Sequence, residues 1–185
     1  YSLVKLAESR DDHTGEHIER VAVLCRLLAT KLLSIPEYKD YIDEDYIENI
    51  YRASPLHDIG KVGISDNILL KPGKLSEEEY ETMKAHTTIG ANTLIEVKKK
   101  YEDNKFLEMG INIAYYHHEK WDGTGYPYGL AGESIPLSAR IMAIVDVYDA
   151  LRSKRVYKEA YSHEKSIEIM KQSAGTNFDP VVLDV

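Results

Sequence analysis

Residues 57–61 read His-Asp-Ile-Gly-Lys, and this short stretch decides how the rest of the chain is interpreted. An adjacent His57-Asp58 pair allows one element to present an imidazole and a carboxylate to the same centre. A carboxylate can bridge two cations through its two oxygens, and imidazole nitrogen binds the same ions. Gly60 follows at once, and a residue without Cβ permits the close approach of another segment. The stretch therefore indicates a candidate metal site.

The other histidines support this interpretation because they fall in groups. A single histidine is most simply a surface residue, or a core residue with satisfied hydrogen bonds. Several histidines beside acids and glycines favour a shared site instead, and glycine-rich sequence from Asp122 follows one histidine pair. His163 stands apart after the expected N-cap Ser162, and we expect it at the surface. The candidates for the site are His13, His17, His57, His86, His117 and His118.

Apolar spacing predicts helices along most of the chain. Apolar residues recur at i, i+3 and i+4 from Glu16 to Leu33, and Ser76 opens a later segment with a capping box. Two stretches rich in glycine, Ile59 to Lys74 and Asp122 to Gly132, are expected to be loops. Since no alternating strand pattern is present, the predicted fold class is all-α. The remaining expected helices run from Tyr46 toward Leu56 and over Phe106–Tyr116, Pro136–Arg152 and Ser162–Ser173.

Length and composition fit one domain over residues 1–185. The hydrophobic fraction of 43% is enough for a core. The single cysteine, Cys25, excludes an internal disulfide and lies at helical spacing among apolar residues, so we expect a core position and a reducing, cytoplasmic location. No apolar run is long enough to span a membrane, and we expect no membrane contact. Because the chain begins at Tyr1, we expect it to be excised from a longer multidomain protein.

The net charge limits the partners. The formal charge is −8, from 23 basic and 31 acidic residues, so the surface should repel DNA and RNA polymers. A phosphate-bearing substrate must then be attracted locally. Bound metal ions can reverse the sign of the field at one site because they are its largest charges.

With these motifs together, the chain resembles the HD-GYP domains, a branch of the HD phosphohydrolase superfamily. The resemblance extends from about Glu8 to Pro180. It implies an all-α HD-domain bundle with a metal centre in a cleft among the helices, and it implies phosphodiesterase activity on cyclic di-GMP. The motifs that carry it are residues 57–61, 84–90 (Lys-Ala-His-Thr-Thr-Ile-Gly), 117–127 (His-His-Glu-Lys-Trp-Asp-Gly-Thr-Gly-Tyr-Pro) and 146–151 (Asp-Val-Tyr-Asp-Ala-Leu).

The resemblance also implies a ligand set for two divalent ions. One ion takes His17, His57, Asp58 and Asp146, and the other takes His86, His117 and His118, with Asp58 bridging. Nitrogen and oxygen ligands without sulfur suit Fe or Mn. His13 lies where relatives with a third metal carry glutamate. Two interpretations therefore stand, an extra ligand for a third ion or a free histidine beside two ions.

The hypothesis for catalysis is attack by a metal-bridging hydroxide on phosphorus, in line with the departing ribose 3′ oxygen. This would open cyclic di-GMP to 5′-pGpG, GMP or both. Asp58 and Lys61 would be catalytic, with Lys61 stabilising oxyanion charge. Each proposed role has a plainer alternative, namely a surface basic residue or a helix-surface acid. By resemblance, the substrate would contact Lys61, Tyr126, Asp149, Arg155 and Lys158. Asp149 could instead orient a metal ligand or a basic residue.

Two further features leave the function open. Lys154 and Val156 stand where relatives often carry aspartate and proline, so substrate fit beside Arg155 is in question. Other functions compete with cyclic di-GMP hydrolysis: hydrolysis of another cyclic dinucleotide such as cyclic GMP-AMP, or a receptor that binds the messenger without turnover. The loop of residues 125–127 (Gly-Tyr-Pro) could instead recruit diguanylate cyclase (GGDEF) proteins. A dimer is also left open.

Overall fold

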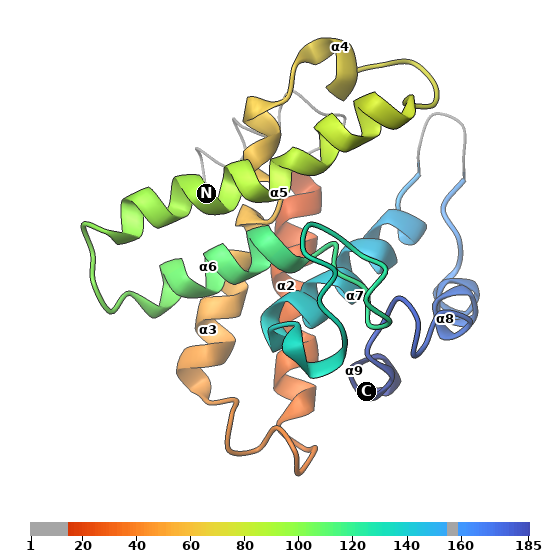
Figure 1. Ribbon diagram of the computed structural model, residues 1–185. Helices are drawn as coiled ribbons and strands as arrows, with labels where there is room; N and C mark the ends of the chain where they lie inside the picture. Colours follow the sequence, from red (N-terminus) through yellow and green to blue (C-terminus); the bar gives the residue numbers. More distant parts are fainter. Residues whose placement is uncertain (1–14, 155–158) are drawn as a thin grey trace.

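The structure, a computed structural model, describes residues 15–154 and 159–185 (Figure 1). Within these residues the chain forms helices and loops and no strand, as the apolar spacing predicts. The elements are α2 (Gly15–Leu32), α3 (Glu44–Ala53), the 3-10 helices η1 (Ser54–Leu56) and η2 (Ile59–Gly63), α4 (Asp66–Leu69), α5 (Glu77–Lys98), α6 (Lys105–Tyr116), the 3-10 helix η3 (Gly132–Ser134), α7 (Leu137–Arg152), α8 (His163–Lys171) and α9 (Pro180–Asp184).

Side-chain caps fix where several helices begin. Ser76 accepts a hydrogen bond from the Glu79 amide, while the Glu79 carboxylate accepts one from the Ser76 amide, which confirms the predicted capping box of α5. Ser162 caps α8 as expected, and Asn104 caps α6. These short polar residues satisfy amides that the first helical turn leaves without partners.

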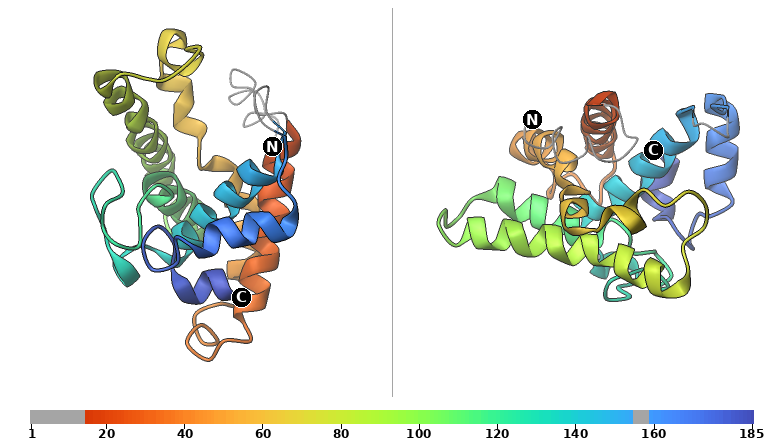
Figure 2. Two further views of the ribbon diagram at one scale, coloured as in Figure 1. Left: turned by 90° about the vertical axis from the view of Figure 1, so that its right-hand side faces the viewer. Right: turned by 90° about the horizontal axis from the view of Figure 1, so that it is seen from above.

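The core lies where α2, α3, α6 and α7 meet. Seen from above, α2 and α3 lie on one side of the molecule and α5 and α6 on the other (Figure 2). The buried face of α2 includes Val21 and Cys25, which pack with Ile113 of α6 and with Ile141 and Met142 of α7. Cys25 is fully buried, as expected, and burial raises its thiol pKa to about 12. None of the described helices is long and apolar enough to cross a membrane.

Two segments differ from the expectation. The stretch from Ile59 to Lys74, predicted to be a loop, contains η2 and the one-turn helix α4. Gly60 is not a breaker there, because η2 packs directly on α5 and a Cβ at this position would overlap the His86 carbonyl oxygen. The short helix α9 was not predicted, although Asp179 caps it and Pro180 occupies its first turn.

Candidate metal centre

Two groups of potential ligands lie side by side in the bundle. Within each group, one ligand atom from every residue lies within 4.8 Å of the others. They come from five places in the fold: α2, the junction of η1 and η2, α5, the end of α6, and α7. One group is Asp58, His86, His117 and His118, and the other is His17, His57 and Asp146.

Hydrogen bonds that the rings donate to backbone carbonyl oxygens orient most of these imidazoles. The Nδ1 atoms of His57, His86 and His117 lie 2.9, 2.7 and 2.9 Å from the carbonyl oxygens of Ser54, Met83 and Ile113. Because a carbonyl oxygen only accepts, each Nδ1 must carry the proton. In the neutral ring with this tautomer, Nε2 has the free lone pair that can bind a metal ion.

The atoms that converge at the centre of the first group fit a cation. His86 Nε2, His117 Nε2 and Asp58 Oδ1 are buried and have no hydrogen-bond partner within the described part of the chain. The two nitrogens lie 3.3 and 3.7 Å from Asp58 Oδ1. Buried polar atoms are rarely left unsatisfied, and three acceptors facing one point would be satisfied by a positive ion. The residues present therefore fit a divalent metal.

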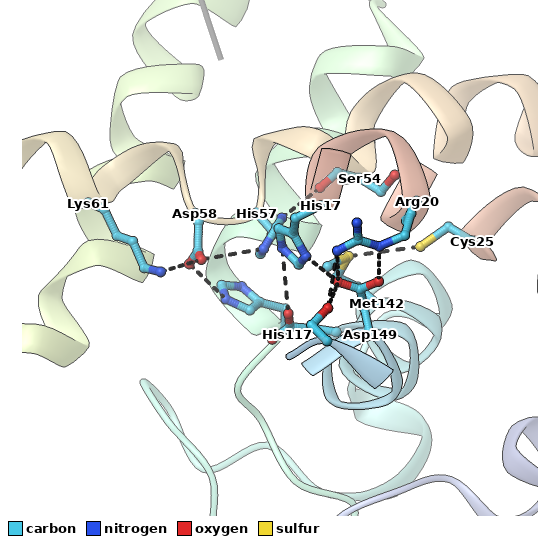
Figure 3. A network of polar contacts seen from close by, with 12 residues as sticks. His17, Arg20, Cys25, Ser54, His57, Asp58, Lys61, His117, Met142 and Asp149 are labelled. Atoms are coloured by element: carbon cyan, nitrogen blue, oxygen red, sulfur yellow. Dashed lines mark hydrogen bonds and ion pairs between the residues drawn. The ribbon is translucent and has the colours of Figure 1, made fainter. Parts of the chain in front are cut away.

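Asp58 belongs to the first group and also faces the second, and Figure 3 shows its carboxylate between Lys61 and His57. Its Oδ1 faces His86 and His117, whereas its Oδ2 lies 3.4 Å from His57 Nε2 and 2.7 Å from Lys61 Nζ. Burial by itself raises the pKa of this carboxyl, but His57 and Lys61 outweigh it and hold the pKa well below its usual value. The carboxylate is thus ionised, with one oxygen directed at each group.

Burial also keeps two imidazoles neutral. It lowers the pKa of His86 to about 4 and holds the pKa of His118 well below its ordinary value. A metal ion binds the neutral form of imidazole. At pH 7 these two side chains can therefore bind a metal ion without first losing a proton.

His17 is oriented by a carboxylate instead of a carbonyl. Its Nδ1 donates to Asp149 Oδ2 at 2.7 Å, and Arg20 Nε donates to Asp149 Oδ1 at 2.6 Å. Asp149 is 2% exposed, which excludes the alternative of a helix-surface acid. Burial raises its pKa, but the bonds from His17 and Arg20 outweigh burial and hold that pKa far below the usual range. The sequence interpretation missed Arg20, three residues beyond His17.

The loop after α6 closes over His118. The Tyr126 ring stacks on the His118 ring, with centroids 4.8 Å apart and planes 22° apart, and the Tyr126–Pro127 peptide is cis. Burial raises the pKa of Tyr126, and Tyr80 and Asp58 raise it further. The buried carboxylate of Glu119, also missed from the sequence, accepts hydrogen bonds from the amides of Tyr128 and Leu130 at 2.8 and 3.0 Å. Glu119 thereby holds the returning half of this loop.

The remaining predicted residues are placed as follows. His13, Arg155, Val156 and Lys158 lie outside the described residues. Lys154 is exposed and forms an ion pair with Glu159 at 2.7 Å. Lys61 is mostly buried against Asp58, unlike a surface lysine. His163 is exposed and hydrogen-bonded to Tyr148, away from the two groups, as expected.

The helical bundle brings histidines and aspartates together around Asp58, which is the arrangement of a metal-binding all-α domain. Residues 2–182 match the HD domain family. The chain therefore belongs to the HD domain family.

Curated relatives carry related names. The chain is 51% identical to a cyclic di-GMP phosphodiesterase of Vibrio cholerae, with 99% of this chain and 37% of the relative covered. It is 42% identical to the cyclic di-GMP phosphodiesterase response regulator RpfG of Xanthomonas campestris, covering 98% and 45%. It is also 42% identical to the 3′3′-cGAMP-specific phosphodiesterase 2 of Vibrio cholerae, covering 100% and 33%. The chain thus spans less than half the length of each of these relatives.

A solved structure shares the fold. It is a crystal structure of a Vibrio cholerae cyclic GMP-AMP-specific phosphodiesterase, with a TM-score of 0.68 and 18% identity. The match covers 99% of this chain and 45% of that one. At this identity the likeness establishes the fold alone.

Proposed function

We propose that this chain is a metal-dependent phosphodiesterase domain of the HD-GYP branch that hydrolyses cyclic di-GMP to 5′-pGpG, GMP or both. The observation that carries the proposal is the position of Asp58 between two groups of nitrogen and oxygen ligands. A carboxylate shared by two cations is an arrangement suited to displacement at phosphorus. The names of the relatives from Vibrio cholerae and Xanthomonas campestris support the choice of substrate.

Cyclic GMP-AMP is the second candidate substrate. A relative at 42% identity is named for it, against 51% for a relative named for cyclic di-GMP. The fold and the metal-ligating residues determine the kind of reaction better than they determine which nucleobase the substrate carries. Because the relative named for cyclic di-GMP is the more similar of the two, we rank cyclic di-GMP first.

Each ligand group would hold one ion. His17, His57 and Asp146 would hold the first, His86, His117 and His118 the second, and Asp58 would contact both. The absence of sulfur favours Fe or Mn. When bound, such ions bind phosphoryl oxygens and lower the pKa of a coordinated water. A third ion would need His13.

The protein's own residues would prepare the site. Lys61 Nζ rests on Asp58 Oδ2 and would place a compact positive charge beside an incoming phosphodiester. Asp149 would fix the orientation of His17, which favours the expected role of orienting a metal ligand over direct contact with the substrate. Tyr126, Arg155 and Lys158 stay proposed substrate contacts, and the Gly125-Tyr126-Pro127 loop stays the proposed contact with GGDEF partners. A longer chain that contains this domain, and its dimerisation, also stay proposals.

The direct test is an assay with defined metals. The protein is reconstituted with Mn²⁺, or with Fe²⁺ without oxygen, and incubated with cyclic di-GMP and 3′3′-cyclic GMP-AMP, and the products are separated by chromatography. We expect 5′-pGpG or GMP from cyclic di-GMP. The variant Asp58→Ala should lose both bound metal and turnover, whereas Asp45→Ala, at an exposed position of α3, should keep both. If the wild type formed no product with any metal and substrate, the proposal would be contradicted, and a receptor that binds the messenger without turnover would be favoured.

A further inference from the structure

Helix α5 directs two side chains at the loop that carries Tyr126. Tyr80 and Lys84 are four residues apart and so share one face of the helix. Lys84 Nζ lies 5.1 Å from the centroid of the Tyr80 ring and 5.5 Å from that of the Tyr126 ring. The two rings meet edge to face, with centroids 6.3 Å apart. We call Tyr80, Lys84 and Tyr126 the aromatic wall.

The aromatic wall begins at the candidate metal centre. Tyr126 stacks on His118, one of the residues grouped with Asp58. From His118 the contacts therefore lead outward through Tyr126 to Tyr80. If the phosphate of a nucleotide lay at the Asp58 group, the sugar and base attached to that phosphate could reach the aromatic wall.

The wall keeps an apolar surface available at its outer end. Tyr80 is 47% exposed, although Tyr126 and Lys84 each contact one part of its ring. A role limited to supporting the loop explains the contacts of Tyr80 but not why almost half of its surface is exposed. An exposed aromatic face can stack on a nucleobase, because every base has a π surface.

The wall also brings positive charge to an acidic protein. Lys84 is paired with Glu81 at 2.6 Å, and its side chain is 26% exposed, whereas that of Glu81 is 69% exposed. The ammonium is thus fixed beside the rings, while its acidic partner lies toward solvent. With a net charge of −8 on the chain, such a local cation is what an anionic nucleotide needs in order to approach.

We propose that Tyr80 and Lys84 bind the nucleoside part of the substrate: a purine base stacks on Tyr80, and Lys84 attracts the nucleotide's phosphate charge. This inference rests on the proposed function and names residues that select a purine nucleotide over a simple phosphodiester. Tyr126 connects this subsite to the metal centre. The base then lies along α5 while the phosphate lies at the ligand groups.

A binding measurement tests the wall without turnover. A hydrolysis-resistant phosphorothioate analogue of cyclic di-GMP is titrated into the metal-loaded protein by calorimetry. Tyr80→Leu should weaken binding on the order of tenfold, and Tyr80→Phe should restore it, because only phenylalanine keeps the π face. Tyr101→Leu, at a tyrosine that is 60% exposed elsewhere on the surface, is the matched control and should bind like the wild type. An unchanged affinity in Tyr80→Leu would overturn the inference.

The lysine has its own matched control. Lys84→Met should weaken binding and reduce its dependence on salt, and Lys84→Arg should recover most of the affinity. Lys99→Met removes a lysine with the same spacing to its partner, Glu96, and the same 2.6 Å ion pair, so it should change neither. Equal affinities for Lys84→Met and Lys99→Met would contradict a role for Lys84.

A comparison of substrates separates binding from structure. For Tyr80→Leu, kcat/KM should fall further for cyclic di-GMP than for methyl p-nitrophenyl phosphate, a diester without a nucleobase. An equal fall for both, or a loss of bound metal, would show a structural role and defeat the inference. If the wild type hydrolyses neither diester, the proposed function fails, and the titration still decides whether the wall binds a purine nucleotide.

Discussion

Arg20 acts on the candidate metal centre through Asp149. The guanidinium donates to both oxygens of this buried carboxylate, and Oδ2 also accepts from His17 Nδ1. We expect Arg20→Met to weaken metal binding about 10- to 100-fold, because partners that orient a ligand have effects of this size. The dissociation constant of Mn²⁺, measured by competition with a chelator, checks the prediction.

A second arginine on α2 provides the control for Arg20. Arg26 pairs with Glu48 at 3.3 Å, and both side chains are almost half exposed. Exposed pairs of this kind contribute little, so Arg26→Met should leave the affinity for Mn²⁺ unchanged. If both variants bound Mn²⁺ equally well, Arg20 would have no positioning role.

At the level of single residues, the sequence predicted which side chains would gather, but not what supports them. The structure gathers these side chains in two groups, with Asp58 beside His86, His117 and His118, and their role as metal ligands stays a prediction. Arg20 was missed because its partner lies 129 residues away, and no local pattern indicates which acid it meets. Glu119 was missed because its bonds to Tyr128 and Leu130 depend on the course of the loop.

At the level of elements, the contact of η2 with α5 brings Asp58 to His86. Gly60 permits this contact: a Cβ there would overlap the His86 carbonyl oxygen and lie 2.5 Å from the Gly90 amide nitrogen. Since backbone cannot move aside easily, we expect Gly60→Ala to destabilise the protein by about 3 kcal/mol, as strong overpacking does. Urea denaturation measures the change.

Gly63, at the end of the same 3-10 helix, is the control for Gly60. The atoms nearest to a Cβ there would be side-chain atoms of Ile89, at 3.0 Å and beyond, and not backbone. Gly63→Ala should therefore change the free energy of unfolding by less than about 1 kcal/mol. If both variants lost a similar amount of unfolding free energy, the close approach of backbone atoms at Gly60 would not be the cause of the destabilisation in Gly60→Ala.

The loop between α6 and α7 depends on one buried acid. Glu119 uses both carboxylate oxygens to accept amide hydrogens from Tyr128 and Leu130. Glu119→Gln replaces one carboxylate oxygen by an NH2 group, so one of the two backbone N–H groups would face another donor. We expect this to lower the free energy of unfolding by about 1 to 3 kcal/mol. Hydrogen exchange at these two amides should become faster. Glu133→Gln, at an exposed position of η3, should leave exchange at these amides as in the wild type.

The errors in the predicted elements have a common cause. Apolar spacing located α2, α6 and α7, because each buries one face in the core, and the capping box at Ser76 located the start of α5. It failed for Ile59–Lys74, where the glycines of η2 serve contact with α5 and not chain flexibility. It also failed for α9, which is too short to show a period. Spacing thus predicts helices that are long and half-buried, and it misses short ones made stable by a neighbour.

At the level of the whole molecule, the bundle keeps a polar site inside a stable fold in part by keeping the imidazoles of His86 and His118 neutral. Burial lowers the pKa of His86 to about 4, against 6.5 in an unfolded chain. Between these two values the unfolded chain binds the proton and the folded chain does not. Stability therefore falls as the pH falls from about 6.5 to about 4.

This gives a prediction for the protein freed of metal by chelation. A pKa difference of this size corresponds to about 3 kcal/mol of unfolding free energy from His86 alone. The loss should be under way at pH 5, whereas the contributions of Asp58 and Asp149, whose pKa values are lowered, are lost only below about pH 4. Urea denaturation at pH 7, 6 and 5 checks it. His86→Gln should flatten the dependence, and His163→Gln, at an exposed histidine, should keep it. A wild-type free energy that stayed constant from pH 7 to pH 5 would show that these imidazoles are not held neutral by the fold.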